Sequence, residues 1–558
     1  MGERLQFGIV RRYASYAAVQ RFLPLLLFAC GFLLCAPSIW SETSITGQDE
    51  YWLSLRTPLE MLERGEWWTP FLDGEPRLRK PPLLYWLMAT SYEVLGVDLF
   101  AARIWSVLAA AGLAVIGYRL QTLLLGRGGA LAALLILGTI GVGIEGRRAM
   151  LDLPLAFFTG LTVLWTARWA QGGRLGWLLA AAAALAGGFL TKGPVPIWFA
   201  VAAGLAALAA GLRRAAPLAP LWHVGAAVLL LLALALPWPI AMAVQWPQFF
   251  ATMEEQARHR ELGLAQLAKA PKVIGGMVGL VFPWTLVALA ALWAALRGQL
   301  GDEARRLRWL ALWCVIAVVP FLFLKAFERY HLPLVLPMCM LAATYLERTR
   351  ASTRRWQMAT AAVLLGVLGL PFCLFALWFG VAIVTPLVAL GLSVWAFFAA
   401  RAGAAPLGVA ARLAVALAAL MGGVYPTLGI NALPADLPPD LSTRTVATFQ
   451  RTQPGMLSIR RQRSVIEVRG EPEVMAAQLR QLDGYLFVHE ADRAAAEAVA
   501  AAAGVTLQPR GRFGSFFSRK VWVRFAREDA AWADWREAFV TRRLDGLQPK
   551  FIYYEIAP

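Results

Sequence analysis

The chain has 558 residues, of which 59% are hydrophobic and only 16% are charged. Soluble globular domains usually carry about 25% charged residues, so this composition excludes an ordinary soluble enzyme, a disordered protein and a collagen-like or disulfide-framework protein. The net charge is +18. In a soluble protein such a charge would suggest a nucleic-acid partner. The short cytoplasmic loops of membrane proteins also collect Lys and Arg, so the position of the charges along the chain decides between the two interpretations.

About thirteen apolar runs of roughly 17–25 residues follow one another along the chain, each long enough to cross a bilayer as a helix. They begin near Phe22, Leu99, Gly129, Leu153, Leu175, Val195, Val224, Val273, Leu307, Leu332, Trp356, Val381 and Leu413. The loops between them alternate between Arg-rich and mixed or acidic. The positive-inside rule then predicts a cytoplasmic N-terminus and residues 431–558 on the outer side.

The domain organisation follows from this alternation. Residues 1–430 form the predicted transmembrane domain, with two long outer loops at 41–98 and 239–272. Apolar residues recur at helical spacing in these loops, which predicts interfacial helices over 50–64, 83–95 and 246–267. Residues 431–558 have the composition of a soluble α/β domain, with strands expected at 465–468, 485–488 and 521–525 and helices at 473–482 and 491–503.

Cofactor signatures are missing from the sequence. The five cysteines lie inside apolar runs, and neither His-x-x-x-His nor Cys-x-x-Cys occurs, so no metal site and no required cofactor are expected. A divalent metal held near His259 would be incidental. Because no Gly-x-Gly-x-x-Gly follows a predicted strand, a nucleotide-sugar donor is not expected either.

Charged motifs recur where predicted spans reach the outer side. The segment 48–52 (Gln-Asp-Glu-Tyr-Trp) follows the first span directly, and 78–86 carries Lys80 immediately before two prolines. Asp152 and Lys192 lie at the outer ends of two further spans. An ionisable residue at a membrane edge usually has a function, although a helix cap or an interfacial anchor explains each motif separately.

Together these motifs resemble those of the lipid-dependent glycosyltransferases of the GT-C fold. The matching segments are Asp49-Glu50, Gly65-Glu66-Trp67, Lys80–Trp86, Met150–Pro154, Thr191–Pro194 and Arg329–Pro333. Within that fold the chain is most similar to the bacterial aminoarabinose transferases, which modify lipid A, and to their protein-mannosyltransferase relatives. Arg79, before Lys80, departs from the apolar or acidic residue expected there.

The resemblance implies a polytopic α-helical protein of the bacterial inner membrane, with its active site and a C-terminal α/β domain facing the periplasm. It implies a donor sugar, 4-amino-4-deoxy-L-arabinose, on undecaprenyl phosphate, and lipid A phosphate as acceptor. The product would be a modified lipopolysaccharide that favours resistance to polymyxin and other cationic peptides. We expect a monomer among membrane lipids and no nucleic-acid partner.

The candidate site residues lie on the predicted outer face. Asp49, Asp152 and, as an alternative, Glu50 are the candidate catalytic carboxylates: one would act as general base if the acceptor is a hydroxyl, whereas an anionic phosphate acceptor needs none. A phosphate leaving group has a second pKa of about 6 and needs positive charge more than a proton donor. The candidate residues for binding the phosphate or the substrate are Lys80, Arg56, Arg147, Arg148, Lys192, Tyr85, His259, Arg260 and Tyr330.

Three other functions remain open at this point. A related enzyme could use the same donor class to glycosylate proteins, which would require a true base. A lipid flippase or transporter would place its charges near the bilayer midplane, whereas here they gather at one face. A membrane scaffold with an outer domain would leave the paired carboxylates and the Lys-Pro-Pro motif unexplained.

Overall fold

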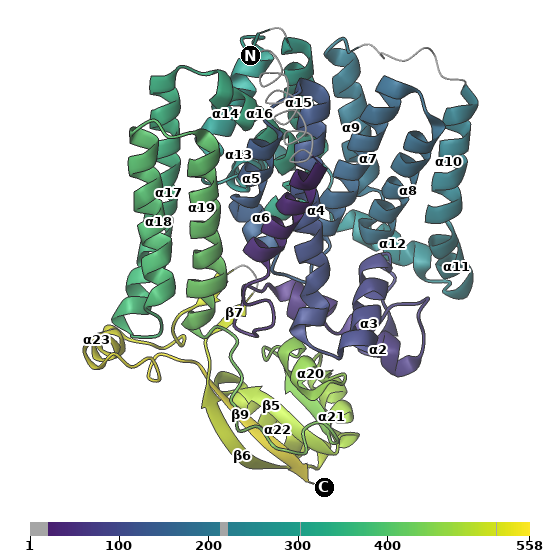
Figure 1. Cartoon of the computed structure of the whole chain (residues 1–558). Helices are drawn as coiled ribbons and strands as arrows, with labels where there is room; N and C mark the ends of the chain where they lie inside the picture. Colours follow the sequence, from purple (N-terminus) through teal and green to yellow (C-terminus); the bar gives the residue numbers. More distant parts are fainter. Residues whose placement is uncertain (1–20, 213–220, 302, 520–521, 558) are drawn as a thin grey trace, which may run out of the picture.

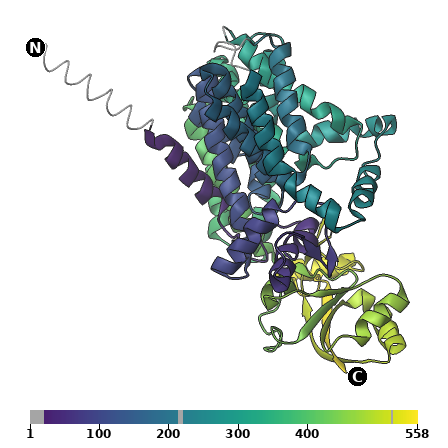
Figure 2. The same cartoon turned by 90° about the vertical axis from the view of Figure 1, so that its right-hand side faces the viewer.

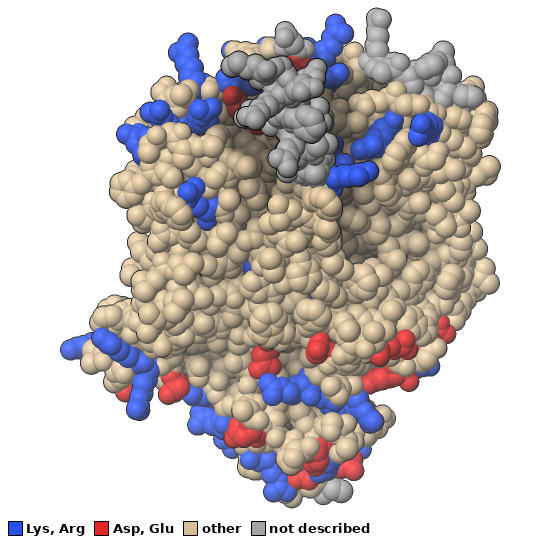
Figure 3. All heavy atoms as spheres, viewed as in Figure 1, with Lys and Arg blue, Asp and Glu red and all other residues tan. Residues whose placement is uncertain are grey.

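The computed structural model describes the chain except residues 1–20, 213–220, 302, 520–521 and 558. Long helices run side by side through most of the molecule, and a domain built on a β-sheet caps one end of them (Figures 1 and 2). Figure 3 shows a broad belt of the helical part that is nearly free of charged side chains. At the end opposite the sheet, Lys and Arg outnumber the acidic residues, whereas charges of both signs are mixed over the sheet domain and at its border with the helices.

Six helices in the described part of the chain are long and apolar enough to cross a membrane. They span Leu99–Leu125, Leu175–Lys192, Leu221–Gln245, Ala351–Trp378, Val384–Arg401 and Pro406–Leu428, and shorter apolar helices span Arg21–Cys35, Val195–Ala209 and Thr285–Leu296. The chain is therefore a multi-pass membrane protein, as its composition predicts. The predicted number of about thirteen spans remains a prediction, because length and composition alone do not define each crossing.

The helices of the membrane region are α4 (Leu99–Leu125), α5 (Gly129–Leu137), α6 (Ile140–Glu145), α7 (Asp152–Gly172), α8 (Leu175–Lys192), α9 (Val195–Ala209), α10 (Leu221–Ala235), α11 (Pro237–Gln245), α13 (Ala270–Gly279), α14 (Thr285–Leu296), α15 (Ala304–Val318), α16 (Val335–Arg348), α17 (Ala351–Trp378), α18 (Val384–Arg401) and α19 (Pro406–Ala419). Short turns of helix extend or join them: η3 (Val319–Leu322), η4 (Glu328–Leu334), η5 (Leu420–Val424) and η6 (Tyr425–Leu428). Most helices of the membrane region pack around one large apolar core, whereas α8, α10 and α11 pack at its side.

The apolar run that begins at Gly129 is not one continuous helix. It breaks into α5 and α6, and Thr139 caps α6 by accepting a hydrogen bond from the Val142 amide. The amides of Ile140 and Gly141 donate to the carbonyls of Phe282 and Leu280, at 2.8 and 2.9 Å. Backbone groups in a membrane must be satisfied internally, and these long-range bonds allow the break. As a result α6 ends at the edge of the cavity described below.

The first outer loop contains η1 (Glu50–Ser54), α2 (Thr57–Arg64), α3 (Leu83–Leu95) and the short hairpin of β1 (Phe71–Leu72) and β2 (Glu75–Pro76). The helix expected at 83–95 is confirmed, whereas the one expected at 50–64 is interrupted between η1 and α2.

In the second outer loop, the prediction of one continuous helix over 246–267 is wrong. The segment forms two helices, α12 (Phe249–Arg258) and η2 (Leu264–Lys269), because the chain turns at Arg260–Gly263. The Arg260 carbonyl accepts from the Lys325 amide at 2.8 Å, and the Gly263 amide donates to Phe323 at 3.0 Å. The turn thereby ties this loop to the segment that precedes η4.

The C-terminal domain is an α/β unit with a mixed five-stranded sheet in the order β4-β3-β5-β9-β6. Its elements are β3 (Thr445–Phe449), α20 (Gly455–Arg461), β4 (Ile466–Val468), α21 (Pro472–Arg480), β5 (Gly484–His489), η7 (Glu490–Asp492), α22 (Arg493–Ala503), β6 (Thr506–Gly514), β7 (Phe517–Arg519), β8 (Trp522–Arg524), α23 (Trp532–Thr541) and β9 (Lys550–Ala557). The strands β3, β4 and β5 are parallel, as helical crossovers require, whereas β9 runs antiparallel to β5 and β6.

The strands expected at 465–468 and 485–488 and both expected helices correspond to elements of this domain. The strand near 521–525 is present as β8, but it pairs with β7 outside the main sheet. The domain boundary at 430/431 remains a prediction.

Candidate functional site

Two carboxylates and two cations meet where α7, α8 and η4 come together. Asp152 begins α7 and is only 2% exposed, and its carboxylate forms an ion pair with Lys192 at the last position of α8. Its second oxygen lies 3.4 Å from Nε of Arg329, on η4. The same guanidinium forms an ion pair with Asp49, whose side chain is 44% exposed. Arg329 therefore bridges a buried and an accessible carboxylate.

Tyr330 connects this bridge to a second group of cations. Lys192 Nζ lies 3.9 Å from the centre of the Tyr330 ring, and the Arg260 guanidinium lies 5.1 Å from it. Arg260 also donates to the Tyr330 hydroxyl at 3.0 Å. The turn at Arg260–Gly263 holds Arg260 here, so an arginine of the second outer loop reaches the ends of α7 and α8.

Lys80 joins the same group from the first outer loop. Its ammonium donates to the Gln256 side chain at 3.0 Å, and the same amide donates to the Arg79 carbonyl. Burial, followed by the like charges of Lys192, Arg260 and Arg77, lowers the pKa of Lys80 to about 7, while Asp152 opposes the shift. Few carboxylates offset these cations, so the site has an excess of positive charge, which suits a phosphate.

Arg77 and Tyr85 form the wall behind Lys80. The guanidinium of Arg77 lies 5.6 Å from the centre of the buried Tyr85 ring. Tyr85 belongs to the first turn of α3, which the prolines at 81 and 82 precede. Both prolines are buried, so the backbone that carries Lys80 is firmly held.

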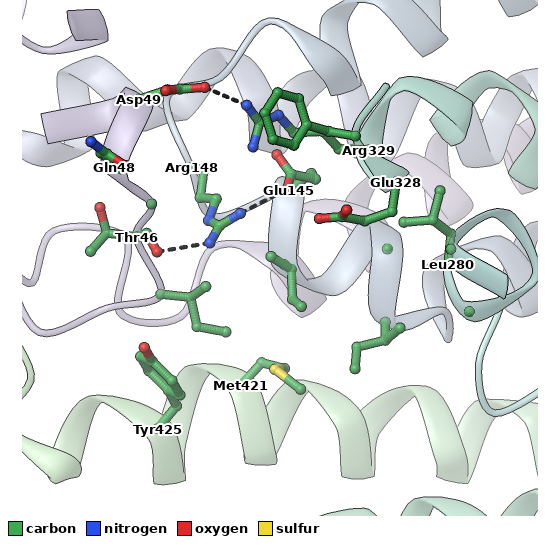
Figure 4. A pocket seen from close by; sticks show the side chains of 18 of the residues that line it. Thr46, Gln48, Asp49, Glu145, Arg148, Leu280, Glu328, Arg329, Met421 and Tyr425 are labelled. Carbon is green, nitrogen blue, oxygen red and sulfur yellow. Dashed lines mark hydrogen bonds and ion pairs between the residues drawn. The ribbon is translucent and has the colours of Figure 1, made fainter. Parts of the chain in front are cut away.

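A cavity of about 680 Å³ opens beside Asp49 and Arg329. Figure 4 shows its polar side, where Arg329 reaches Asp49 and Arg148 contacts both Glu145 and the Thr46 carbonyl, each at 2.8 Å. The opposite wall is apolar and comes from α17, η5 and η6, with Leu368, Phe372, Leu420, Met421 and Tyr425. An amphiphile with a charged head and hydrocarbon chains fits such a lining.

The structure brings most of the predicted site residues together. Asp152, Lys192, Lys80, Arg260 and Tyr330 form one cluster, which we call the cationic cluster. Asp49 and Arg148 line the adjoining cavity, and Tyr85 lies against Arg77.

Three predicted residues instead form buried structural contacts. Glu50 is paired with Arg103, both fully buried, and accepts the Ala149 amide at 2.9 Å. Arg56 is fully buried and joins the C-terminal domain through Glu467 and the Val465 carbonyl. Arg147 donates to the carbonyls of Gly143 and Leu34 at 2.6 Å each.

His259 is exposed, and its ring nitrogen Nδ1 forms a hydrogen bond with the Glu255 carbonyl at 2.8 Å, within its own helical turn. Among the described residues, no three His, Cys, Asp or Glu side chains gather in a group that could hold a metal ion. The expectation that no cofactor is required stays a prediction.

Sequence reasoning did not single out Arg329, Gln256, Glu145 or Arg77 as site residues. Arg329 could have been identified from the sequence, since it precedes the candidate residue Tyr330 in one of the matching motifs. Gln256 and Arg77 had none, because their roles depend on how two distant loops meet.

Comparison with known proteins gives consistent results. A sequence profile described as dolichyl-phosphate-mannose-protein mannosyltransferase matches residues 79–239. A relative from Pseudomonas fluorescens, named undecaprenyl phosphate-alpha-4-amino-4-deoxy-L-arabinose arabinosyl transferase 1, is 29% identical over 60% of this chain and 61% of its own length. A transferase of the same type from Serratia proteamaculans is 28% identical over 57% of this chain and 58% of its own. The chain thus matches about three fifths of the length of these relatives.

Two solved structures of ArnT from Cupriavidus metallidurans share the fold over nearly the whole chain. The apo form superposes with a TM-score of 0.68 at 16% identity and covers 96% of this chain and 98% of that one. The form bound to undecaprenyl phosphate gives 0.67 at 17% identity and covers 95% and 97%. The predicted resemblance and the predicted fold class are confirmed.

Proposed function

We propose that this chain, a GT-C-fold membrane protein similar to the aminoarabinose transferases, is a glycosyltransferase. It moves 4-amino-4-deoxy-L-arabinose from undecaprenyl phosphate to a phosphate of lipid A. The observation that carries the proposal is the cationic cluster around a buried carboxylate, next to a cavity with one charged and one apolar side. The names of the sequence relatives supply the sugar and the donor lipid, undecaprenyl phosphate, whereas lipid A as acceptor is what the resemblance to the aminoarabinose transferases implies.

The cationic cluster suits the donor phosphate. Cleavage of the sugar–phosphate bond develops negative charge on the phosphate oxygens, and positioned cations stabilise that charge more in the transition state than in the ground state. Lys192 and Arg260 supply two such cations at Tyr330, and Lys80 supplies a third close to both of them. Lys192 is already paired with Asp152, so it can hold this carboxylate in place while it faces the phosphate.

The cavity beside Asp49 suits the acceptor. A lipid A phosphate is already anionic and requires no general base, so the carboxylates would have another role: to attract the ammonium group of the amino sugar. Asp49 is the accessible member of the pair and Asp152 the buried one. Arg329 and Arg148 would meet the acceptor phosphate from the polar side of the cavity.

The charge distribution supports an inner-membrane protein whose site faces the periplasm. Lys and Arg predominate over acidic residues at the end of the helices opposite the C-terminal domain, whereas both signs are mixed at the other end (Figure 3), and basic loops usually stay in the cytoplasm. Reporter fusions at Gly403, in the loop between α18 and α19, and at the C-terminus should therefore report opposite sides. Fusions that report the same side would contradict this orientation.

The central experiment is mass spectrometry of lipid A from cells with and without the gene. Lipid A should gain one 4-amino-4-deoxypentose only when the intact protein is present, and cationic-peptide resistance should rise with it. Cells that make the Asp152→Asn variant at equal level provide the control. Unchanged lipid A together with a newly glycosylated protein would instead indicate the protein-glycosylating function.

A further inference from the structure

The helix α23 exposes more large apolar side chains than any other element in the described part of the C-terminal domain. Trp532 is 82% exposed, Val540 76% and Phe539 50%. With Arg536 they occupy positions i, i+4, i+7 and i+8, which fall on one face of a helix. We call Trp532, Phe539 and Val540 the apolar stripe. An exposed stripe of this kind marks a surface that meets an apolar partner.

The other face of α23 is fixed to the membrane region. Ala538 is buried in a small apolar cluster with Leu428 and Phe516, and Trp535 packs against it. Phe372 and Tyr425, which line the cavity, pack against the same cluster. The helix is therefore held beside the cavity rather than free to move with the sheet.

Contacts with α17 establish the depth of α23 relative to the helices. Trp378 is the last residue of α17, and its indole nitrogen donates to the Phe539 carbonyl at 3.1 Å. The rings of Phe379 and Phe539 lie 5.6 Å apart. Just beyond, Ile383 and Val384 at the start of α18 are exposed. Figure 1 shows α23 beside the ends of α17 and α18, where these two helices leave the uncharged belt.

Basic residues accompany the stripe. Arg536 lies among the apolar side chains, and Arg542 and Arg543 follow the helix. Arg542 stacks its guanidinium 4.7 Å from the centre of the Trp378 ring, so this charge sits at the level of the span end. Aromatic and basic side chains on one helix at that level suit the headgroup region, where rings lie near the acyl boundary and arginines meet lipid phosphates.

We propose that α23 is an interfacial helix that inserts its apolar stripe into the bilayer leaflet on the side of the C-terminal domain. Its arginines contact the phosphate groups of anionic lipids. The bilayer is thus a second attachment for the C-terminal domain, at the edge of the cavity. The proposal rests on the membrane location of the chain and not on the transferase activity, so the two can fail separately.

The test places an environment-sensitive bimane label on Val540→Cys in the full-length protein, reconstituted in lipid nanodiscs. A matched label on Val474→Cys, an exposed residue of α21, serves as the control, and the unmodified protein corrects for its own cysteines. We expect shallow nitroxide lipids to quench the label at 540 and aqueous iodide to quench it at least threefold less than at 474. Equal iodide quenching at both sites without lipid quenching would overturn the proposal. Protection from iodide without lipid quenching, as in a protein–protein contact, would overturn it as well.

A separate experiment tests the contact between the arginines of α23 and lipid phosphates. Phosphatidylglycerol in the nanodisc should increase the iodide protection at 540, and the combined Arg536→Gln, Arg542→Gln and Arg543→Gln variant should lose this dependence. Equal protection with and without phosphatidylglycerol would overturn the phosphate contact. If Val540→Cys fails to fold, the label moves to Ala533, which is exposed on the same helix.

Discussion

Lys80 should make the affinity for a lipid phosphate fall as the pH rises through neutrality. Burial and the neighbouring cations lower the pKa of its ammonium to about 7 in the free protein. A bound phosphate would add negative charge beside it and raise that pKa, so binding takes up a proton. By linkage, the protonated form that binds phosphate is fully populated below the free-protein pKa and is lost above it.

The size of the effect follows from the same pKa. Between pH 6 and pH 8, a group that titrates near 7 in the free protein and well above 8 in the complex weakens the apparent affinity by about tenfold. Neutral Lys80 retains a hydrogen bond, so the loss levels off at higher pH. The Lys80→Arg variant stays charged throughout this range and should show a nearly flat profile above pH 7.

Isothermal titration with a polyprenyl phosphate diester in detergent measures this directly, because a diester does not itself titrate between pH 6 and pH 9. The proton uptake should also appear as a dependence of the binding enthalpy on the buffer. If the wild-type and Lys80→Arg proteins share one pH profile, Lys80 does not face the phosphate and the reasoning is refuted.

The other variants separate chemistry from folding. Asp152→Asn should retain binding of the lipid phosphate but lower the transfer rate by about 100-fold or more, as loss of a positioned charge commonly does; a full transfer rate would remove Asp152 from the site. Arg56→Met strands the buried carboxylate of Glu467 and should lower the free energy of unfolding by about 3–5 kcal/mol, measured by thermal and urea melts. Arg460→Gln, which breaks an exposed ion pair between the same two domains, should cost no more than about 1 kcal/mol. Asp49→Asn should raise the affinity for the phosphate-bearing acceptor but lower the transfer rate.

The membrane architecture was predictable because apolar runs of sufficient length have few alternatives. The break between α5 and α6 was not, since the carbonyls that satisfy it belong to Leu280 and Phe282, far away in the sequence. The strand β9 was missed for a related reason. Its place between β5 and β6 is set by pairing with partners on both sides, which a single-sequence pattern does not reveal.

The sequence indicated which charged residues lie near the site, but it did not reveal which of them form ion pairs with one another. Asp152 and Asp49 were predicted from their position at the ends of spans, and the structure joins both to one guanidinium. Arg56 is a cation in the same outer loop as Lys80, yet it is buried and paired with Asp73 and with Glu467 of the C-terminal domain. Only tertiary contacts separate a cation that can bind a ligand from one already neutralised by a carboxylate.

The predicted effect of Asp49→Asn follows from the position of Arg329 between the carboxylates of Asp49 and Asp152. In the structure Asp49 neutralises this guanidinium at the wall of the cavity, and Asp152 approaches it from the buried side. An acceptor phosphate that enters the cavity must compete with Asp49 for Arg329. Asp49→Asn keeps the side-chain shape but removes the competing charge, so the affinity for a phosphate-bearing acceptor should rise. One charge-assisted contact contributes about 1.5–3 kcal/mol, which corresponds to an increase of about 10-fold or more.

The same substitution should lower transfer, because the released Asp49 carboxylate is the accessible group that can attract the sugar ammonium. Binding of lipid A and of lipid A without its phosphates, measured on the purified variant and the wild type, tests the competition. The gain should appear only with the phosphorylated lipid. An unchanged or weaker affinity of Asp49→Asn for phosphorylated lipid A would mean that Arg329 does not receive the acceptor, and that its function is to hold the two carboxylates together.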